Sequence, residues 1–254
     1  MTSELPDRLR LRYEKVGRLR FTSQRDLARI WERLLRSVGA PLRYSEGFSP
    51  HPILAFAAAL PTGAASLAEY LDVRFDAKEQ RAAMPWAVGT GTIAGIGDLV
   101  AALNERAPEG LRITAAAGLD GTEDSLQEQV ALVRWELVVE GLAETEVQER
   151  CERMMASSEV LVQRERKGRT VVDDIRGNIL TLSTTPGAAW SMVTELRTQP
   201  RGIRPMELLG ALDPALRMVR ATRTHQWIER DGSRREPLEN GVFAVTNPLL
   251  GATS

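Results

Sequence analysis

The sequence predicts an α+β protein built from two similar halves, and three observations carry that prediction. Apolar and polar residues alternate with period two in several segments, as they do in half-buried strands. Between these segments, apolar residues recur three and four positions apart, as on the buried face of a helix. Each half follows the order β-α-β-β-α-β, which is the ferredoxin-like pattern. At ~100–150 residues per domain, the 254 residues accommodate two tandem ferredoxin-like domains with antiparallel sheets.

The first half opens with a strand and a helix. Leu9 to Tyr13 alternates apolar and polar residues and predicts a strand. Ser23 stands where an N-cap belongs, and apolar residues from Leu27 to Val38 follow at helical spacing. Gly39 and Pro41 end this helix, because glycine favours the C-cap and proline cannot continue the helix.

The rest of this half is expected to complete the pattern. Patterning predicts further strands at 42–44, 53–60, 69–75 and 111–116, and a short helix at 98–107. We therefore place the first domain at residues 1–117, followed by an acidic and polar linker at 118–129.

The second half, residues 130–254, repeats the element order, with a C-terminal tail from about residue 236. Strands are expected at 130–140, 180–182, 190–196 and 218–228, and helices at 144–156 and 205–212, the latter begun by Pro205. Residues 160–166 and 169–174 flank Lys167-Gly168 and predict a hairpin. The halves share an element order but no sequence repeat.

Charge is unevenly distributed along the chain. Residues 1–56 hold 11 basic and 6 acidic side chains, and residues 161–254 hold 14 and 10. The middle, residues 57–160, holds 8 basic and 18 acidic side chains, so the whole chain carries a formal charge of -1. Two basic ends that converged into one positive face would suit an anionic partner such as RNA. The alternative is that these arginines are solvated surface.

Several function classes lack their sequence signals. The single Cys151 excludes an intramolecular disulfide framework and a cysteine-based metal site within the chain. The two imidazoles, His51 and His225, have no metal-ligand spacing, and no phosphate-binding glycine motif or nucleophile elbow occurs, so we expect neither metal nor cofactor. No apolar run reaches the ~18–20 residues of a membrane span, and the charged first 20 residues contain no secretory signal. These observations predict a cytoplasmic protein with no membrane contact.

The loop at 44–52 is the first candidate binding segment. Gly47 permits close backbone approach, while Pro50 and Pro52 stiffen the chain on both sides of His51. Presented on such a loop, the side chains of Tyr44, Phe48 and His51 could stack on a nucleotide base and hydrogen-bond to it. The alternative is a structural turn with Phe48 tucked into the core.

The predicted hairpin is the second candidate. Its basic residues could grip backbone phosphates together with Arg176, which follows an acidic pair. These residues are Arg164, Arg166, Lys167 and Arg169. The alternative is a solvated hairpin.

Several motifs occur together in the first half and extend into the second. They are Tyr13-x-Lys15-x-Gly17-x-Leu19-Arg20-Phe21-x-Ser23-x-x-Asp26-Leu27, Arg33-x-x-Arg36, Tyr44-Ser45-x-Gly47-Phe48-Ser49-Pro50-His51-Pro52, Pro61-x-Gly63, Glu69-Tyr70-Leu71-Asp72 and Asp174-Ile175-Arg176. Together they resemble the radical-SAM-linked (radical SAM-associated) bacterial family, a domain of unknown function found free-standing or fused to B12-binding-type radical SAM proteins. The resemblance implies a radical SAM protein as partner, which would supply the cluster and the S-adenosylmethionine.

Two positions depart from the family pattern. Gln24 stands where members commonly have a histidine, and Gly177 stands where they often have a proline. An amide does not titrate, so Gln24 could not serve as an acid or base. This departure argues against essential catalysis at that position.

We therefore expect a non-catalytic RNA-binding or substrate-presenting accessory protein of a radical SAM enzyme. In the first half, RNA would be held by Arg20, Arg29, Arg33, Tyr44, Phe48 and His51. The basic hairpin would lie opposite these residues, so the two groups of side chains should line a common cleft. Two alternatives stay open: a metal-independent RNA-processing enzyme with His51 as general base aided by Tyr44, and a protein-interaction scaffold using the acidic residues 120–152.

Overall fold

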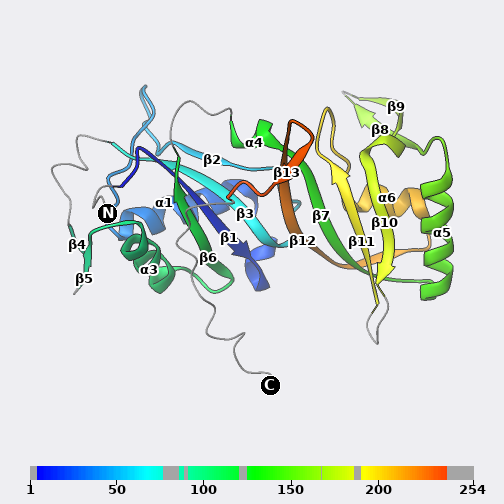
Figure 1. The fold of residues 1–254 in the computed structure, drawn as a ribbon, viewed down its shortest axis with the longest axis horizontal. Coiled ribbons are helices and arrows are strands. Elements are labelled where there is room, and N and C mark those ends of the chain that lie inside the picture. Colours follow the sequence, from blue (N-terminus) through cyan, green and yellow to red (C-terminus); the bar gives the residue numbers. More distant parts are fainter. Residues whose placement is uncertain are drawn as a thin grey trace, which may run out of the picture.

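The computed structural model describes residues 5–76, 86–88, 91–119, 125–166, 168–185 and 190–238, and these form a mixed α+β fold (Figure 1). The main feature of these residues is a nine-stranded, mostly antiparallel sheet. No helix in the described ranges is both long enough and apolar enough to cross a membrane.

The first half contributes four strands to this sheet. Its elements are β1 (Arg8–Lys15), the 3-10 helix η1 (Gly17–Phe21), α1 (Gln24–Ser37), β2 (Leu54–Phe56), β3 (Ala65–Arg74), α3 (Ile96–Arg106) and β6 (Leu111–Gly118). Two short strands, β4 (Trp86–Val88) and β5 (Gly91–Ile93), form a separate two-stranded sheet. Helix α1 begins as predicted, because the Ser23 hydroxyl accepts a hydrogen bond from the Asp26 backbone N–H at 3.2 Å.

Two predicted strands of this half are shorter than expected. Residues 42–44 form only isolated bridges, Leu42 with Phe75 and Tyr44 with Pro52. The strand predicted at 53–60 is limited to β2. Residues 57–64 leave the sheet edge because Leu60 and its apolar neighbours pack into the core of the second half.

The second half contributes the other strands. Its elements are α4 (Leu126–Gln129), β7 (Val130–Glu140), α5 (Glu144–Ala156), β8 (Leu161–Arg166), β9 (Arg169–Asp174), the 3-10 helix η2 (Arg176–Asn178), β10 (Ile179–Thr185), β11 (Ser191–Arg197), α6 (Pro205–Leu212), β12 (Arg217–Arg230) and β13 (Ser233–Arg235). The predicted hairpin is confirmed as β8–β9, which pair antiparallel. Within the predicted linker, residues 126–129 form α4, whose Leu126 is fully buried. Of the predicted tail, residues 239–254 lie outside the described residues.

The strand order shows how the halves join. The main path of the sheet is β10-β11-β7-β12-β3-β1-β6, with β2 paired to β3 and β13 paired to β12. Neighbours are antiparallel except at the seam, where β12 runs parallel to β3 through Thr222 opposite Ala65 and Arg223 opposite Ser66. One continuous sheet therefore spans both halves.

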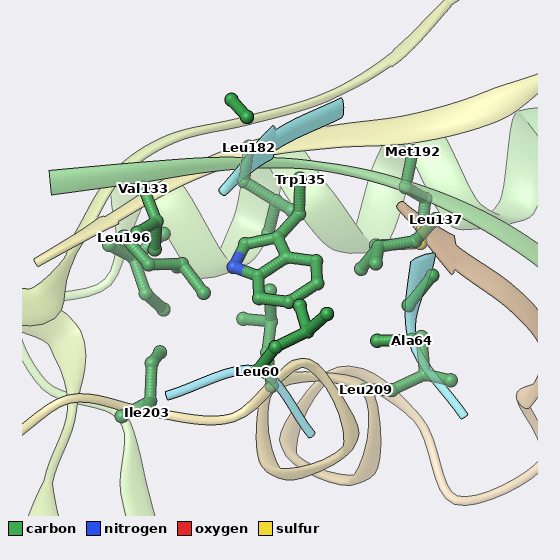
Figure 2. Packing of buried hydrophobic residues seen from close by; sticks show 14 of the residues in the cluster. Leu60, Ala64, Val133, Trp135, Leu137, Leu182, Met192, Leu196, Ile203 and Leu209 are labelled. Atoms are coloured by element: carbon green, nitrogen blue, oxygen red, sulfur yellow. The ribbon is translucent and has the colours of Figure 1, made fainter. Parts of the chain in front are cut away.

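Two hydrophobic clusters fill the core. One lies in the first half around Leu11, Trp31 and Leu99. The other lies in the second half around Trp135, and Figure 2 shows Leu60 of the first half packed beside it. The second cluster is therefore shared by both halves.

Buried ion pairs lie on both faces of β3. The guanidinium groups of Arg8 and Arg10 bind the Asp72 carboxylate at 2.5 and 2.7 Å, and all three side chains are buried. At the seam, the buried Arg223 guanidinium binds the Glu69 carboxylate at 2.5 Å. Each ion pair joins side chains from two different strands, so it forms only when those strands are in the correct register.

Cys151 gives a direct test of this packing. Burial on α5 raises the pKa of its thiol to about 11. At pH 8 the thiolate fraction is then about 100-fold below that of an exposed cysteine. We expect 5,5′-dithiobis(2-nitrobenzoate) to react at least about 100-fold more slowly with the native protein than with the chain unfolded in guanidinium. Because Cys151 is the single cysteine, the signal is unambiguous, and rates within tenfold of each other would contradict its burial.

Candidate nucleic-acid interface

Helix α1 carries a stripe of exposed arginines. Arg25, Arg29, Arg33 and Arg36 are spaced by four, four and three residues, which places them on one face of the helix. All four are exposed, and the opposite face packs into the core through residues such as Trp31. We call these four residues the arginine stripe; it contains the predicted Arg29 and Arg33.

The charge of the stripe is largely available to a ligand. Arg29 forms an ion pair with Asp26 at 3.5 Å, but both side chains are more than half exposed. Such exposed pairs contribute at most about 1 kcal/mol. The Arg36 guanidinium lies 5.8 Å from the ring centroid of Tyr44, so the stripe ends at the predicted loop.

The loop from Tyr44 to Pro52 projects from the fold, at the upper left of Figure 1. It closes as a narrow hairpin, because the Ser45 N–H donates to the His51 carbonyl at 2.9 Å. Gly47 adopts a φ of 124°, a backbone conformation that favours glycine. The Phe48 side chain is fully exposed, so the alternative in which Phe48 packs into the core is wrong.

The imidazole of His51 has only local partners among the described residues. Its Nδ1 lies 3.0 Å from the Ser45 hydroxyl and 3.4 Å from the Ser49 carbonyl. The second histidine, His225, lies on β12 with its Nε2 4.0 Å from the Glu236 carboxylate, and burial lowers its pKa. The two imidazoles therefore belong to different elements and surroundings.

Arg20 lies outside the stripe. It belongs to η1, and its guanidinium stacks over the exposed ring of Phe21 at 4.6 Å. The Arg20 carbonyl accepts a hydrogen bond from the Gly63 N–H at 2.8 Å, which ties η1 to the turn at 61–63. Arg20 thus stands at the seam end of α1, whereas the loop stands at the other end.

Two of the predicted hairpin-side arginines stabilise the fold. The nearly buried Arg164 pairs with Glu207 at 2.9 Å and with Asp173 at 3.5 Å. The Arg176 guanidinium donates to the carbonyls of Met155, Ser157 and Ile179. These contacts occupy both guanidinium groups and leave them poorly placed to bind phosphate.

The hairpin does not join the first-half site. In Figure 1, β8–β9 lies at the upper right, at the opposite end of the sheet from the 44–52 loop. Arg169 is exposed there; Lys167 and the side chain of Arg166 lie outside the described residues. The expectation of one common cleft is therefore wrong, because the sheet order places the strands of both halves between the two segments.

Sequence reasoning missed a groove at the seam. Two adjoining hollows lie on either side of Arg204-Pro205 and the turn at 59–61, with volumes of about 620 and 740 Å³. Arg223 and Trp135 line the smaller hollow, and Arg220 lines the larger one. One signal was available in the sequence: Arg223 shares a face of the predicted strand 218–228 with the apolar Ala221 and Trp227, and a charge on such a face implies a partner.

Comparisons with known proteins give a family and a distant structural neighbour. A family model described as "Uncharacterized protein conserved in bacteria (DUF2344)" matches residues 8–205. None of the curated proteins matches the sequence. A chain in the solved structure "Crystal Structure of a Cbf5-Nop10-Gar1 Complex" is similar with a TM-score of 0.42 and 8% identity, over 86% of this chain. This chain spans about half of that one, 48% of its length.

Proposed function

The chain belongs to the bacterial family DUF2344, and from its surface we propose that it is a non-catalytic protein that binds RNA and presents it to a partner enzyme. The observation that carries this proposal is the fully exposed Phe48 at the tip of a braced loop whose Tyr44 meets the arginine stripe. Exposing a phenylalanine fully to water has no folding benefit, but it offers a stacking platform for a base.

The arginine stripe and the 44–52 loop would bind different parts of an RNA strand. Arginine binds phosphate oxygens bidentately, and its four copies along α1 follow one line on the helix surface. Base stacking on an aromatic side chain contributes about 1–3 kcal/mol per base and tolerates any sequence. A single strand that ran along α1 would place its backbone on the stripe and a base on Phe48.

The order of strands supports a finer proposal for the fold. In the first half β2-β3-β1-β6 are neighbours, and in the second half β10-β11-β7-β12 are neighbours, each set antiparallel. We propose that each half is a ferredoxin-like unit and that β8–β9 is an insertion in the second. The radical SAM partner rests on the sequence resemblance and remains part of this proposal.

A second candidate function is metal-independent RNA processing. The observation that favours it is the exposed imidazole of His51, which lies 3.0 Å from the Ser45 hydroxyl beside the proposed binding surface. RNA cleavage in the presence of a chelator, abolished by His51→Ala but not by Phe48→Tyr, would favour this enzyme over a presenting protein.

RNA binding is tested with a single-stranded oligonucleotide across a series of salt concentrations. Replacing both Arg29 and Arg33 by alanine should weaken binding about tenfold or more and reduce the salt slope by about 1.4, because two phosphate contacts are lost. Phe48→Ala should weaken binding by about 1–3 kcal/mol with little change in salt slope, since stacking releases no counterion.

The control for this series is Arg153→Ala, which removes an exposed arginine from α5 in the other half. It should leave affinity within twofold. If the wild type does not bind RNA, or if the stripe variants behave like Arg153→Ala, the proposed function is wrong.

A further inference from the structure

The larger hollow at the seam has the charge and shape of an anion site. Arg204 and Arg220 both line it, both are exposed, and neither forms an ion pair with another described residue. The described residues that line this hollow include no aspartate or glutamate. Two arginines that line one hollow without an ion-pair partner raise its positive potential, which favours a bound anion.

The wall of the hollow is apolar. Met206 is 60% exposed and Val219 is 56% exposed, and both line it beside Leu60. Exposed apolar side chains that gather at a hollow mark ligand-binding surfaces more often than isolated ones do. A volume of about 740 Å³ lies within the range of small-ligand sites. The apolar wall and the two arginines together fit a ligand that has a flat organic part and a phosphate.

The hollow also adjoins the proposed RNA surface. Gln24, the first residue of α1, lines it, and Arg25 of the arginine stripe follows directly in the chain. Gly63 lines it too and is held by the carbonyl of Arg20. A strand that followed the stripe toward the N-terminal end of α1 would therefore arrive at this hollow.

We propose that the hollow binds the phosphate monoester of a nucleotide, with Arg204 and Arg220 on the phosphate and the nucleoside against Met206 and Val219. A monoester carries a charge of about −1.5 to −2, which two arginines match, whereas an internal phosphodiester carries one. The nucleotide is either the phosphorylated end of an RNA strand or a free nucleoside monophosphate. The first source rests on the proposed function, and the second does not.

Calorimetric titration with a nucleoside monophosphate tests the site itself. The wild type should bind it at least about tenfold more tightly than the matching nucleoside, and Arg204→Ala or Arg220→Ala should each weaken binding about tenfold. Arg230→Ala is the matched control, because Arg230 is an exposed arginine on the same strand, β12, outside the hollow. It should leave binding within twofold. No binding by the wild type, or equal effects of Arg220→Ala and Arg230→Ala, would overturn the proposal.

Oligonucleotides with and without a terminal phosphate distinguish the two sources of the nucleotide. If the ligand is an RNA end, an oligonucleotide with a terminal phosphate should bind about tenfold more tightly than its hydroxyl-ended form, and this preference should vanish in Arg204→Ala/Arg220→Ala. Loss of the preference with retained salt-dependent binding assigns the end to the hollow and the strand to α1. If RNA fails to bind while the monophosphate binds as expected, the proposed function is wrong and the hollow is a site for free nucleotides.

Discussion

Asp72→Asn should lower the free energy of unfolding by about 3–5 kcal/mol, which is the cost expected when one partner of a buried ion pair is removed. Asp72 is 2% exposed and its two oxygens serve both Arg8 and Arg10. The asparagine keeps the volume of the side chain but removes the charge that balances two buried guanidinium groups. The large effect follows from those guanidinium groups, since they stay charged at any accessible pH.

Denaturant unfolding followed by circular dichroism measures this loss as a shift of the midpoint. Glu140→Gln supplies the control, because its pair with Arg217 at 3.4 Å has side chains 60% and 75% exposed. Such an exposed pair contributes at most about 1 kcal/mol, so the control should change stability little. If Asp72→Asn lost no more than Glu140→Gln, the Asp72 cluster would not stabilise the fold as described.

Glu69→Gln should have an effect of similar size, about 3–5 kcal/mol, for the same physical reason. Arg223 is 1% exposed and binds Glu69 through both Nε and Nη2. It also donates to the carbonyls of Ala58 and Ala59, which line the smaller hollow at the seam. Removing the Glu69 charge therefore destabilises the fold and loosens one wall of the groove.

The double variant Glu69→Met/Arg223→Met separates charge burial from packing. Apolar side chains that replace a whole buried pair are often neutral or stabilising, so much of the lost stability should return. The measurement is again the unfolding midpoint, beside that of Glu69→Gln alone. A double variant as unstable as the single one would mean that the pair acts through shape rather than charge.

Local sequence signals predicted most elements well. Helix α1 follows from a serine cap and an apolar periodicity that are both complete within 16 residues of the chain. The hairpin β8–β9 follows from alternating segments around Lys167-Gly168. These elements form where their own neighbours in sequence supply the cap, the turn and the buried face.

Contacts between distant segments were not predictable in the same way. The parallel pairing of Arg223 with Ser66 joins residues more than 150 positions apart, and nothing near either residue specifies it. Residues 57–60 were expected to extend a strand, but Ala57 and Leu60 are buried in the core cluster that both halves share. Apolar residues indicate burial without indicating the surface that buries them.

The same difference between local signals and distant contacts applies to the candidate site. Residue types identified the 44–52 loop, but the exposure of Phe48 depends on whether the loop projects or folds back, which the sequence left open. Charge counts identified two basic segments without their relative position, and sheet order placed them at opposite ends. The hollow with Arg204 and Arg220 is formed by residues from both halves, so no single segment of sequence pointed to it.

The seam has a consequence for synthesis on the ribosome. Strands β1, β2, β3 and β6 all lie before residue 119, so they can pair while the rest of the chain is still being made. One edge of β3 is shared between β2, at Leu71–Val73, and the later β12, at Ala65–Ser66. Until β12 emerges, this part of the β3 edge lacks its partner strand, and an unpaired edge is the kind that recruits foreign strands. Once β12 has been made, it covers this edge of β3. The strand therefore protects the nascent protein from aggregation and also joins the two halves of its sheet.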